Sequence, residues 1–175
     1  MPVSFRRSGG SIRVVVLVLS MVMATIGGAA AQRQATPPWL IPVEAPPAKA
    51  EIEVGTTTVT VELAVTPSQQ TLGLGYRNGL EPGTGMLFVN DRARPQTFWM
   101  KGMRFCLDIV WIENGEIVGA AENVCPDPAG TSDRDRARFS SPEAVTYVLE
   151  VPAGWLQENG YGRGTRVTIP ATIHP

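Results

Sequence analysis

The chain has 175 residues, 43% of them hydrophobic and 18% charged, which suits one globular domain with room for little else. Its formal charge is −1, and no run of like charge is long enough to follow a phosphate backbone, so we expect no nucleic-acid partner. The single histidine, His174, is the penultimate residue, which argues against Ser-His-Asp or Cys-His catalysis and against a metal site. No Gly-rich phosphate-binding motif follows a strand, so we expect no cofactor.

The first 31 residues are typical of a secretory signal peptide. An apolar run over 14–26 has arginines before it and small residues after it, namely Arg6, Arg7 and Arg13 on one side and Ala29, Ala30 and Ala31 on the other. Ala29 and Ala31 fit an A-x-A cleavage site, so we predict export to the periplasm or the medium, with membrane contact only during export. Cleavage after Ala31 would leave 12 basic and 16 acidic side chains, a net charge of −4. The alternative is an uncleaved membrane anchor, because the run extended to Ala31 approaches the length of a bilayer span.

A proline-rich tether is predicted over residues 32–50. Its prolines are Pro37, Pro38, Pro42, Pro46 and Pro47. Because proline cannot donate to a hydrogen-bonded ladder, this segment should run extended. One apolar cluster, Trp39, Leu40 and Ile41, interrupts the tether, and it either docks on the domain or contacts a partner.

From Glu51 to the C-terminus at residue 175, short β-branched runs alternate with Gly, Pro and Asn, which predicts a single β-rich α+β domain. In chain order we expect strands at 52–54, 58–65, 86–89, 97–101, 107–113, 116–122, 146–151 and 165–169. We expect short helices over 67–74, with Thr66 as N-cap, and over 153–158. These seven or eight strands should form a barrel-like or two-sheet arrangement, with an exposed polar loop over 126–142.

The two strands around Asn114-Gly115 are the strongest hairpin signal, because both turn residues tolerate a positive φ. In the first of these strands, Asp108, Val110 and Ile112 share one face, and Leu107, Ile109 and Trp111 share the other. Apart from Asp108 both faces are apolar, which predicts a central strand that buries a carboxylate.

Five motifs occur in order along the domain: Arg77-x-Gly79-Leu80, Gly85-Met86-Leu87-Phe88, Phe98-Trp99-Met100-Lys101, Leu107-Asp108-Ile109, and Tyr147-Val148-Leu149-Glu150 followed by Gly154. Together they resemble the domain of unknown function 192 family over residues 52–169. The chain departs from the family pattern at Gly75, at Gly102-Met103 and at Cys106, where the family usually has Met, Asn-Thr and Pro. The resemblance implies a β-rich fold with small helical pieces. It implies no activity, because the family has no established one, and no catalytic residue is carried over.

Asp108 is the first candidate site residue. A buried carboxylate without partners is costly, so Asp108 needs a cation or several hydrogen-bond donors. The functional interpretation is a polar site at the end of the sheet, where Asp108 acts as base or anchor and Lys101 or Arg77 holds an anion. The structural alternatives are an ion pair with one of these cations, or a carboxylate that binds backbone amides at a turn.

Trp99 and Lys101 would project to the same side of a regular strand. An aromatic face beside an ammonium group suits a sugar ring or a flat anionic ligand. Core packing of the tryptophan with a lysine that extends to solvent explains the same pattern.

Two functions from different classes follow. In the first, the protein is an exported, non-enzymatic module that binds a small molecule, a glycan or an envelope protein through Arg77, Trp99, Lys101 and Asp108. In the second, it is an enzyme that processes an envelope polymer with a carboxylate pair, Asp108 with Glu150 or Glu122. The sequence favours the first, because it shows no activated nucleophile and no metal-ligand cluster. A third alternative is a structural partner domain without a pocket.

The two cysteines, Cys106 and Cys125, are predicted to form a disulfide, because the destination is oxidising and two ligands cannot complete a zinc shell. A regular hairpin register would place Cys106 opposite Asn123 and leave Cys125 two residues further along. That diagonal distance is slightly too long for a disulfide, so we expect the open end of the hairpin to curl inward. The alternative is two free thiols packed as small hydrophobic groups.

Overall fold

A computed structural model of the protein describes Met1 and residues 45–173. The predicted signal peptide beyond Met1, most of the tether and the cluster at Trp39 lie outside the described residues. Residues 45–48 have no regular secondary structure, and the first strand begins at Lys49, two residues before the predicted start of the domain.

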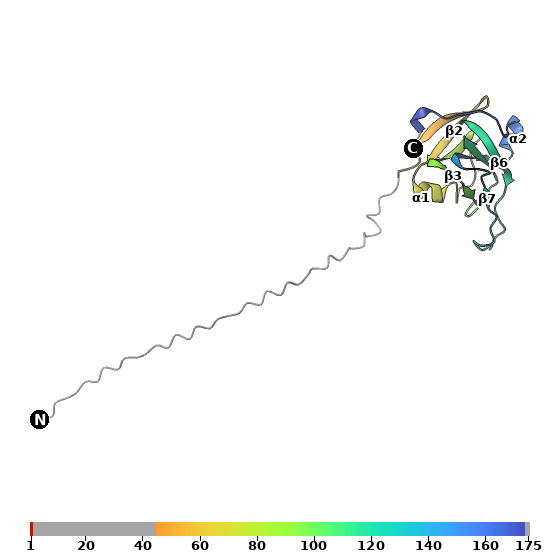
Figure 1. The fold of residues 1–175 in the computed structure, drawn as a ribbon. Helices are drawn as coiled ribbons and strands as arrows, with labels where there is room; N and C mark the ends of the chain where they lie inside the picture. Colours follow the sequence, from red (N-terminus) through yellow and green to blue (C-terminus); the bar gives the residue numbers. More distant parts are fainter. Residues whose placement is uncertain (2–44, 174–175) are drawn as a thin grey trace. The chain divides into compact units, whose positions relative to one another are not determined.

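The domain is built on a curved seven-stranded sheet in the order β6-β5-β8-β3-β2-β1-β9 (Figure 1). Its strands are β1 (Lys49–Val54), β2 (Thr57–Ala64), β3 (Thr84–Arg94), β5 (Leu107–Glu113), β6 (Glu116–Val124), β8 (Val145–Pro152) and β9 (Val167–Thr168). A second, two-stranded sheet pairs β4 (Thr97–Phe98) with β7 (Phe139–Ser140). The short helices are α1 (Pro67–Leu72) and α2 (Trp155–Asn159), and a 3₁₀ turn, η2 (Ala171–Ile173), follows β9. The predicted β-rich α+β class is confirmed.

Two hairpins form, one of them the hairpin predicted around Asn114-Gly115. β1 and β2 pair antiparallel, and β5 and β6 pair around Asn114 and Gly115, whose φ angles are 52° and 74°. Between β2 and its parallel neighbour β3 the chain crosses over through α1. Thr66 caps this helix: its hydroxyl accepts from the amide of Gln69, whose side chain accepts in return from the amide of Thr66.

The segment before and within β9 joins β1 to β6. Val167 pairs with Val54 of β1, and its amide also donates to the carbonyl of Gly115 at the start of β6. Arg166 forms a single antiparallel bridge with Glu116. The sheet is therefore a half-barrel whose edges meet at residues 164–167.

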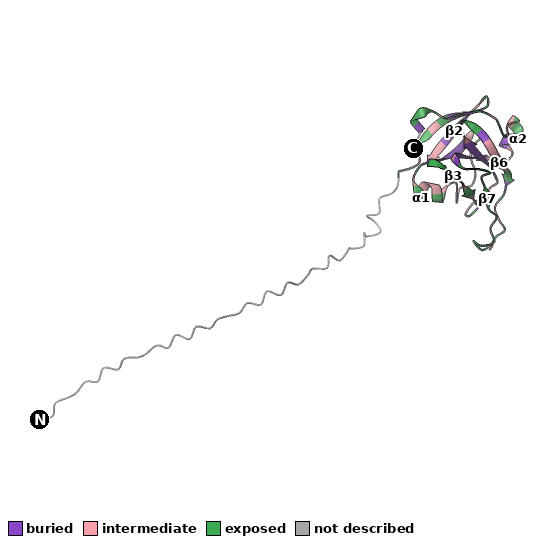
Figure 2. Cartoon of the chain, viewed as in Figure 1, coloured by how far each residue is buried: buried purple, intermediate pink, exposed green. Residues whose placement is uncertain are grey.

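Each face of the sheet carries its own apolar core, and the buried residues concentrate in its strands (Figure 2). Along β5, Val110 and Ile112 belong to the core on one face, and Ile109 and Trp111 to the core on the other. β5 lies between β6 and β8. The prediction of a central strand with two apolar faces is confirmed, because only a strand covered on both sides can bury both sets of side chains.

The structure differs from the predicted elements at several strand ends, where β3 extends to Arg94 and β9 shrinks to two residues, and more fully in the region of β4 and β7. The strand expected over 97–101 ends at Phe98, because the chain turns at Met100, whose carbonyl accepts from the amide of Met103, and passes through Gly102 at a φ of 77°. The loop expected over 126–142 contains β7, which pairs with β4. A two-residue strand has too few side chains to show an alternating pattern in the sequence.

Candidate functional site

Asp108 is fully buried and binds backbone amides. Its Oδ1 accepts from the amides of Asn123 at 2.8 Å and Gly154 at 3.1 Å, and its Oδ2 accepts from the amide of Leu156 at 3.0 Å. Gly154 is the N-cap of α2 and has no side chain to cap the helix, so Asp108 supplies the missing acceptor from β5. Of the alternatives open for Asp108, the carboxylate that binds amides at a turn is the one observed.

Neither candidate cation pairs with Asp108, so the ion-pair alternative is not the one observed. Lys101 Nζ lies 2.5 Å from Asp133 Oδ2, and Arg77 forms two parallel hydrogen bonds of 2.6 and 2.8 Å with Glu62. Three amide donors already satisfy the Asp108 carboxylate, which removes the need for a cation. Arg77 holds the pKa of the Glu62 carboxyl below its usual value, chiefly by hydrogen bonding.

The carboxylates proposed for an enzyme do not converge. Asp108 lies opposite Val151 in the β5–β8 ladder, and Val151 belongs to the same core as Val110. Glu150, the next residue along β8, therefore points to the other face, where it lies between Met86 and Ile109. Glu122 is exposed on β6.

Glu150 is itself unusual. It is 6% exposed, and its Oε2 has no hydrogen-bond partner among the described residues. Burial raises the pKa of its carboxyl to about 8. At neutral pH this side chain is mainly a neutral acid within an apolar core.

The structure brings Trp99 and Lys101 together at a groove of about 720 Å³ between α1 and the turn after β4. We call it the aromatic groove, and it is lined by Pro67, Ser68, Gln70, Thr71, Leu72, Tyr76, Trp99 and Lys101. Arg77 lines a separate cavity of about 160 Å³ beside Glu62, and Asp108 is buried away from solvent. The four predicted ligand-binding residues therefore divide among three places.

The aromatic groove gathers most of the exposed apolar side chains of the described domain. Over residues 45–173, the large hydrophobic residues that are exposed are Val65 (54%), Leu72 (58%), Tyr76 (65%) and Trp99 (38%). Three of these line the groove, and Val65 immediately precedes the N-cap of α1. A concentrated apolar patch of this kind marks an interaction site more often than scattered residues do.

The conformation of Tyr76 is strained. Its φ is 66°, in the left-handed region that non-glycine residues rarely adopt, and its amide donates to the carbonyl of Gly102. The Tyr76 ring lies against Gly102 so closely that a Cβ there would be 3.2 Å from Cζ of the ring. Gly102 thus holds the exposed Tyr76 ring at the groove in two ways, by a backbone hydrogen bond and by the close approach that its missing side chain allows. Backbone strain of the kind seen at Tyr76 is often found at functional sites.

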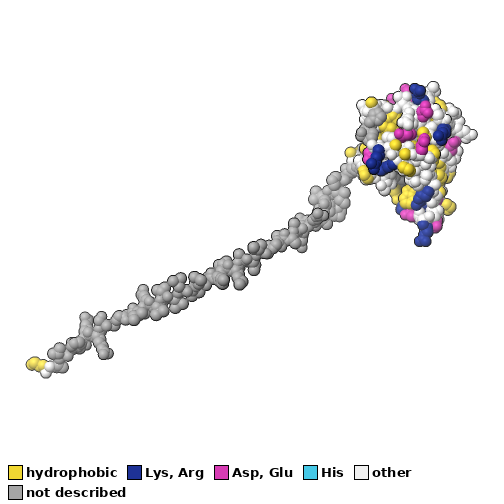
Figure 3. All heavy atoms as spheres, viewed as in Figure 1, with side chains coloured by type: hydrophobic (Ala, Val, Ile, Leu, Met, Phe, Trp, Pro, Cys, Tyr) yellow, Lys and Arg dark blue, Asp and Glu magenta, His cyan; other side chains and the backbone are white. Residues whose placement is uncertain are grey.

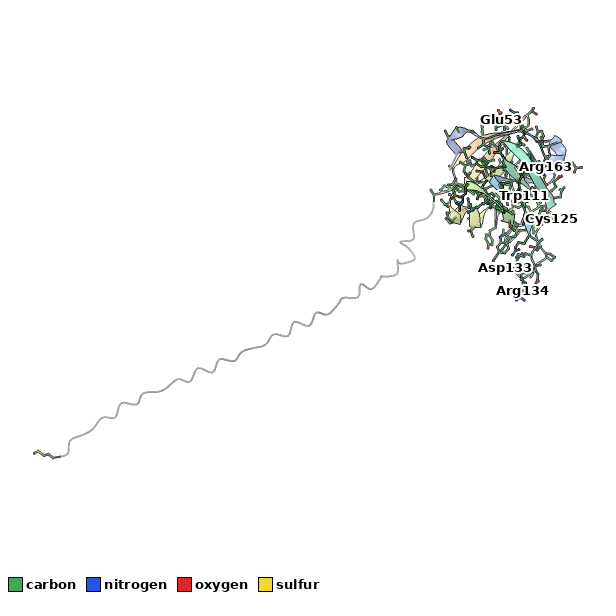
Figure 4. The ribbon with its side chains drawn as sticks, viewed as in Figure 1. Glu53, Trp111, Cys125, Asp133, Arg134 and Arg163 are labelled. Atoms are coloured by element: carbon green, nitrogen blue, oxygen red, sulfur yellow. A yellow bond between two sulfur atoms is a disulfide. The ribbon has the colours of Figure 1, made fainter. Side chains whose placement is uncertain are left out.

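Two cations lie against the Trp99 ring. Arg138 Cζ is 4.2 Å and Lys101 Nζ is 5.1 Å from the ring centroid, both within cation–π range. Arg138 belongs to the loop between Cys125 and β7, and Asp133 and Arg134 stand at the far end of that loop (Figure 4). On the face shown in Figure 3, basic and acidic side chains are interspersed over the domain.

The predicted disulfide between Cys106 and Cys125 forms, with a Cα–Cα distance of 4.0 Å. It does not require the hairpin to curl inward. The ladder between β5 and β6 is shifted twice, once between Trp111 and Ile112 and once between Leu107 and Ile109, so that Leu107 pairs with Val124. Two bulges absorb the two extra residues of β6 and place the cysteines directly opposite each other.

Sequence analysis missed three residues of the groove region, Leu72, Tyr76 and Arg138. Tyr76 adjoins the Arg77 motif, and Leu72 falls within the predicted helix, but neither position shows in the sequence that its side chain is exposed. Arg138 was included in the polar loop, and only the tertiary structure places it on Trp99.

Within residues 45–173, no helix has the length and apolarity to cross a membrane. No group of three or more His, Cys, Asp or Glu side chains there is arranged to hold a metal ion.

The model of the family DUF192, described as "Uncharacterized ACR", matches residues 49–169. No curated protein matches the chain. Among solved structures, the chain is similar to a protein of Sinorhizobium meliloti 1021 described as a "putative transcription regulator", with 37% identity and a TM-score of 0.63 over 71% of this chain and 95% of that one. It is also similar to a protein of unknown function from Novosphingobium aromaticivorans DSM 12444, with 25% identity and a TM-score of 0.62 over 73% of this chain and 94% of that one.

Proposed function

The chain belongs to the DUF192 family of uncharacterised proteins, and we propose that it is an exported, non-enzymatic domain that binds glycans in the aromatic groove. The observation that carries this proposal is the gathering of Leu72, Tyr76 and Trp99 around one hollow. Tyr76 and Trp99 remain 65% and 38% exposed at a concave surface, although two cations lie on the Trp99 ring, and the C–H face of a sugar ring packs on exposed aromatic side chains.

The rest of the groove lining offers polar groups for the edge of a sugar. Ser68 and Thr71 contribute hydroxyl groups and Lys101 an ammonium group, whereas the amide N–H group of Gln70 binds the carbonyls of Ala64 and Val89. Ligand sites in proteins commonly combine a largely apolar surface with a few polar groups that fix the orientation of the ligand.

The non-enzymatic part of the proposal is supported by the two buried carboxylates. Asp108 uses both oxygens to bind amides, and Glu150 points to the opposite face of the sheet. A glycosidase pair needs two carboxyl groups roughly 5 to 10 Å apart across one substrate bond, which side chains on opposite faces of a sheet cannot provide.

Export is supported by the charged start, the apolar run and the alanine cluster within residues 1–31. The disulfide agrees with this address, because such bonds persist in oxidising compartments. The balance of 12 basic and 16 acidic side chains after cleavage gives no support to a nucleic-acid partner.

The proposal is tested by isothermal titration of the oxidised domain, residues 32–175, with a panel of oligosaccharides from envelope and extracellular polymers. At least one oligosaccharide should bind, and Trp99→Ala and Tyr76→Ala should each weaken that binding about tenfold or more, equivalent to about 1.4 kcal/mol. Val65→Ala is the matched control, because Val65 is equally exposed but does not line the groove. Absence of binding across the panel, or equal losses in the control, would contradict the proposal. An envelope protein captured through the same residues would then replace the glycan.

A further inference from the structure

Resting on the proposed glycan site, we infer that the glycan is acidic and that Arg138, with Lys101, recognises the carboxylate carried by its sugar ring. Arg138 is then a specificity-determining residue beside the aromatic groove, and it selects the chemical class of the ligand.

Arg138 is unusual because its guanidinium binds backbone carbonyls and no carboxylate among the described residues. Its guanidinium donates only to backbone carbonyls of its own loop, to Arg136 at 3.2 Å and to Asp133 at 2.8 Å. It forms no ion pair with a carboxylate among the described residues, although the side chain is exposed. A guanidinium has five N–H donors, so three of them are left to bind something else.

The ion pairs near Trp99 leave one positive charge over. In the same loop, Arg136 is paired with both Asp127 and Asp133, and Asp133 is also paired with Lys101. Asp127 and Asp133 together compensate the charges of Arg136 and Lys101. Among the described residues, no carboxylate pairs with Arg138. One positive charge therefore remains uncompensated at the tryptophan, in a domain whose net charge is negative.

The lining of the aromatic groove is itself positively charged. None of its eight lining residues is acidic, and Lys101 is its one charged residue. An anion that enters the groove therefore meets an ammonium group and no carboxylate in the lining, with the guanidinium of Arg138 on the Trp99 ring. This is the charge complementarity that favours an anionic over a neutral ligand.

The geometry suits a ring that carries its charge on a short substituent. A sugar ring packed beside Trp99 would bring its carboxylate to the planar guanidinium that lies over the Trp99 ring, where the free N–H groups of Arg138 can bind both oxygens. Asp133 is 54% exposed at its side chain and bonded to Lys101, so an incoming carboxylate can take its place on the ammonium without displacing a buried group.

The experiment compares an oligogalacturonate hexamer with its fully methyl-esterified form, which has the same rings and no charge. Isothermal titration of the oxidised domain should show the acid binding at least tenfold more tightly than the ester. The difference should shrink as salt rises from 50 to 500 mM, because charge attraction is screened.

Because it weakens binding of the acid far more than binding of the ester, Arg138→Gln should abolish the preference for the acid. Arg138→Lys, which keeps the charge but loses the planar fork, should restore part of it. The matched control is Arg134→Gln, at an exposed arginine of the same loop that is not among the groove-lining residues, and it should leave both affinities unchanged. Thermal unfolding of each variant shows that the fold is retained.

The outcomes separate this inference from the proposed function. Equal binding of acid and ester, abolished in both cases by Trp99→Ala, would overturn the acidic ligand and leave the glycan site standing. A preference for the acid that survives in Arg138→Gln would overturn the role of Arg138. Binding of neither hexamer would overturn the inference, and the oligosaccharide panel then decides the proposed function alone.

Discussion

The Asp108 carboxylate accepts a hydrogen bond of 3.0 Å from the amide of Leu156, 48 residues further along the chain. Through the same side chain, β5 is joined to the start of α2 and, at Asn123, to the end of β6. Asn123 has a φ of 51°, so its backbone is held in a costly conformation that the Asp108 bond helps to stabilise. The aspartate of one sequence motif thus fixes three separate pieces of backbone.

Asp108→Asn should destabilise the domain. The amide side chain turns one acceptor into a donor that faces a backbone N–H, and a buried donor left without a partner costs about 1 to 3 kcal/mol, with the loss of a charged acceptor adding to it. We expect urea unfolding at pH 7 to show a loss of about 3 kcal/mol, with groove binding unchanged at temperatures where the variant is folded. Asp91→Asn, at an exposed position of β3, is the control and should have almost no effect.

Glu150→Gln should change how stability depends on pH. The folded protein keeps a proton on Glu150 up to about pH 8, whereas an unfolded chain loses it near pH 4.5. The folded state therefore binds more protons between these values, and stability falls as pH rises from 4.5 to 8, by up to about 1.4 kcal/mol per pH unit.

The glutamine variant cannot ionise, so its free energy of unfolding should be nearly flat across that range and exceed that of the natural protein at pH 8. Chemical unfolding at pH 5, 6.5 and 8 measures the difference. Glu53→Gln, on the exposed side of β1, should keep the natural slope. Parallel pH profiles for the natural protein and Glu150→Gln would show that Glu150 is already ionised at neutral pH.

Replacing both cysteines by serine should destabilise the domain by about 3 kcal/mol, because the disulfide closes a loop of about 20 residues in the unfolded chain. Urea unfolding of the oxidised protein and of the double variant gives this difference. Alkylation and mass analysis of protein taken from the cell envelope should find no free thiol. Two alkylated cysteines would mean that the bond does not form there.

Gly102→Ala should weaken ligand binding more than it weakens the fold. Alanine at a φ of 77° costs about 1 to 2 kcal/mol, and its Cβ would push against the Tyr76 ring. Gly130→Ala is a matched control, because Gly130 also has a positive φ, of 85°, but has no atom within 4 Å of its added Cβ. Both variants should lose similar stability, and only Gly102→Ala should lose affinity in titration.

Protein recovered from the periplasm or the medium should have the intact mass of a chain that begins at Gln32. The expected cause is cleavage after Ala31 by the secretory machinery. A cell-associated protein that retains residues 1–31 would instead support the membrane-anchor alternative.

The local part of the fold could be predicted from the sequence. Asn114-Gly115 defined the β5–β6 hairpin, and Thr66-Pro67 defined the start of α1, because turns and caps depend on residues that are neighbours in the chain. The first pair of the hairpin, Glu113 with Glu116, is also the one a two-residue turn predicts.

The bulges of β6 were missed, although Gly119 and Asn123, beside the two register shifts, are residue types that bulges favour, because the strand pattern alone hides where the extra residues lie. The partners of Asp108 were equally hidden, since backbone amides are present at every residue and only the fold selects those of Asn123, Gly154 and Leu156. For the same reason the sequence grouped Arg77 and Asp108 with Trp99, although the fold separates them. Only the neighbouring pair Trp99 and Lys101 stayed together.

Residues 164–168 form the last β-structure within the described part of the chain, and they contact both β1 and β6. Without those residues, β1 and β6 would each present an unpaired edge. Unpaired edges are templates for aggregation and for domain swapping between copies. Residues 164–168 therefore cover both edges, and a chain that stops before Gly164 should appear as dimers and aggregates in size-exclusion chromatography although its two apolar cores are complete in all but their final residues.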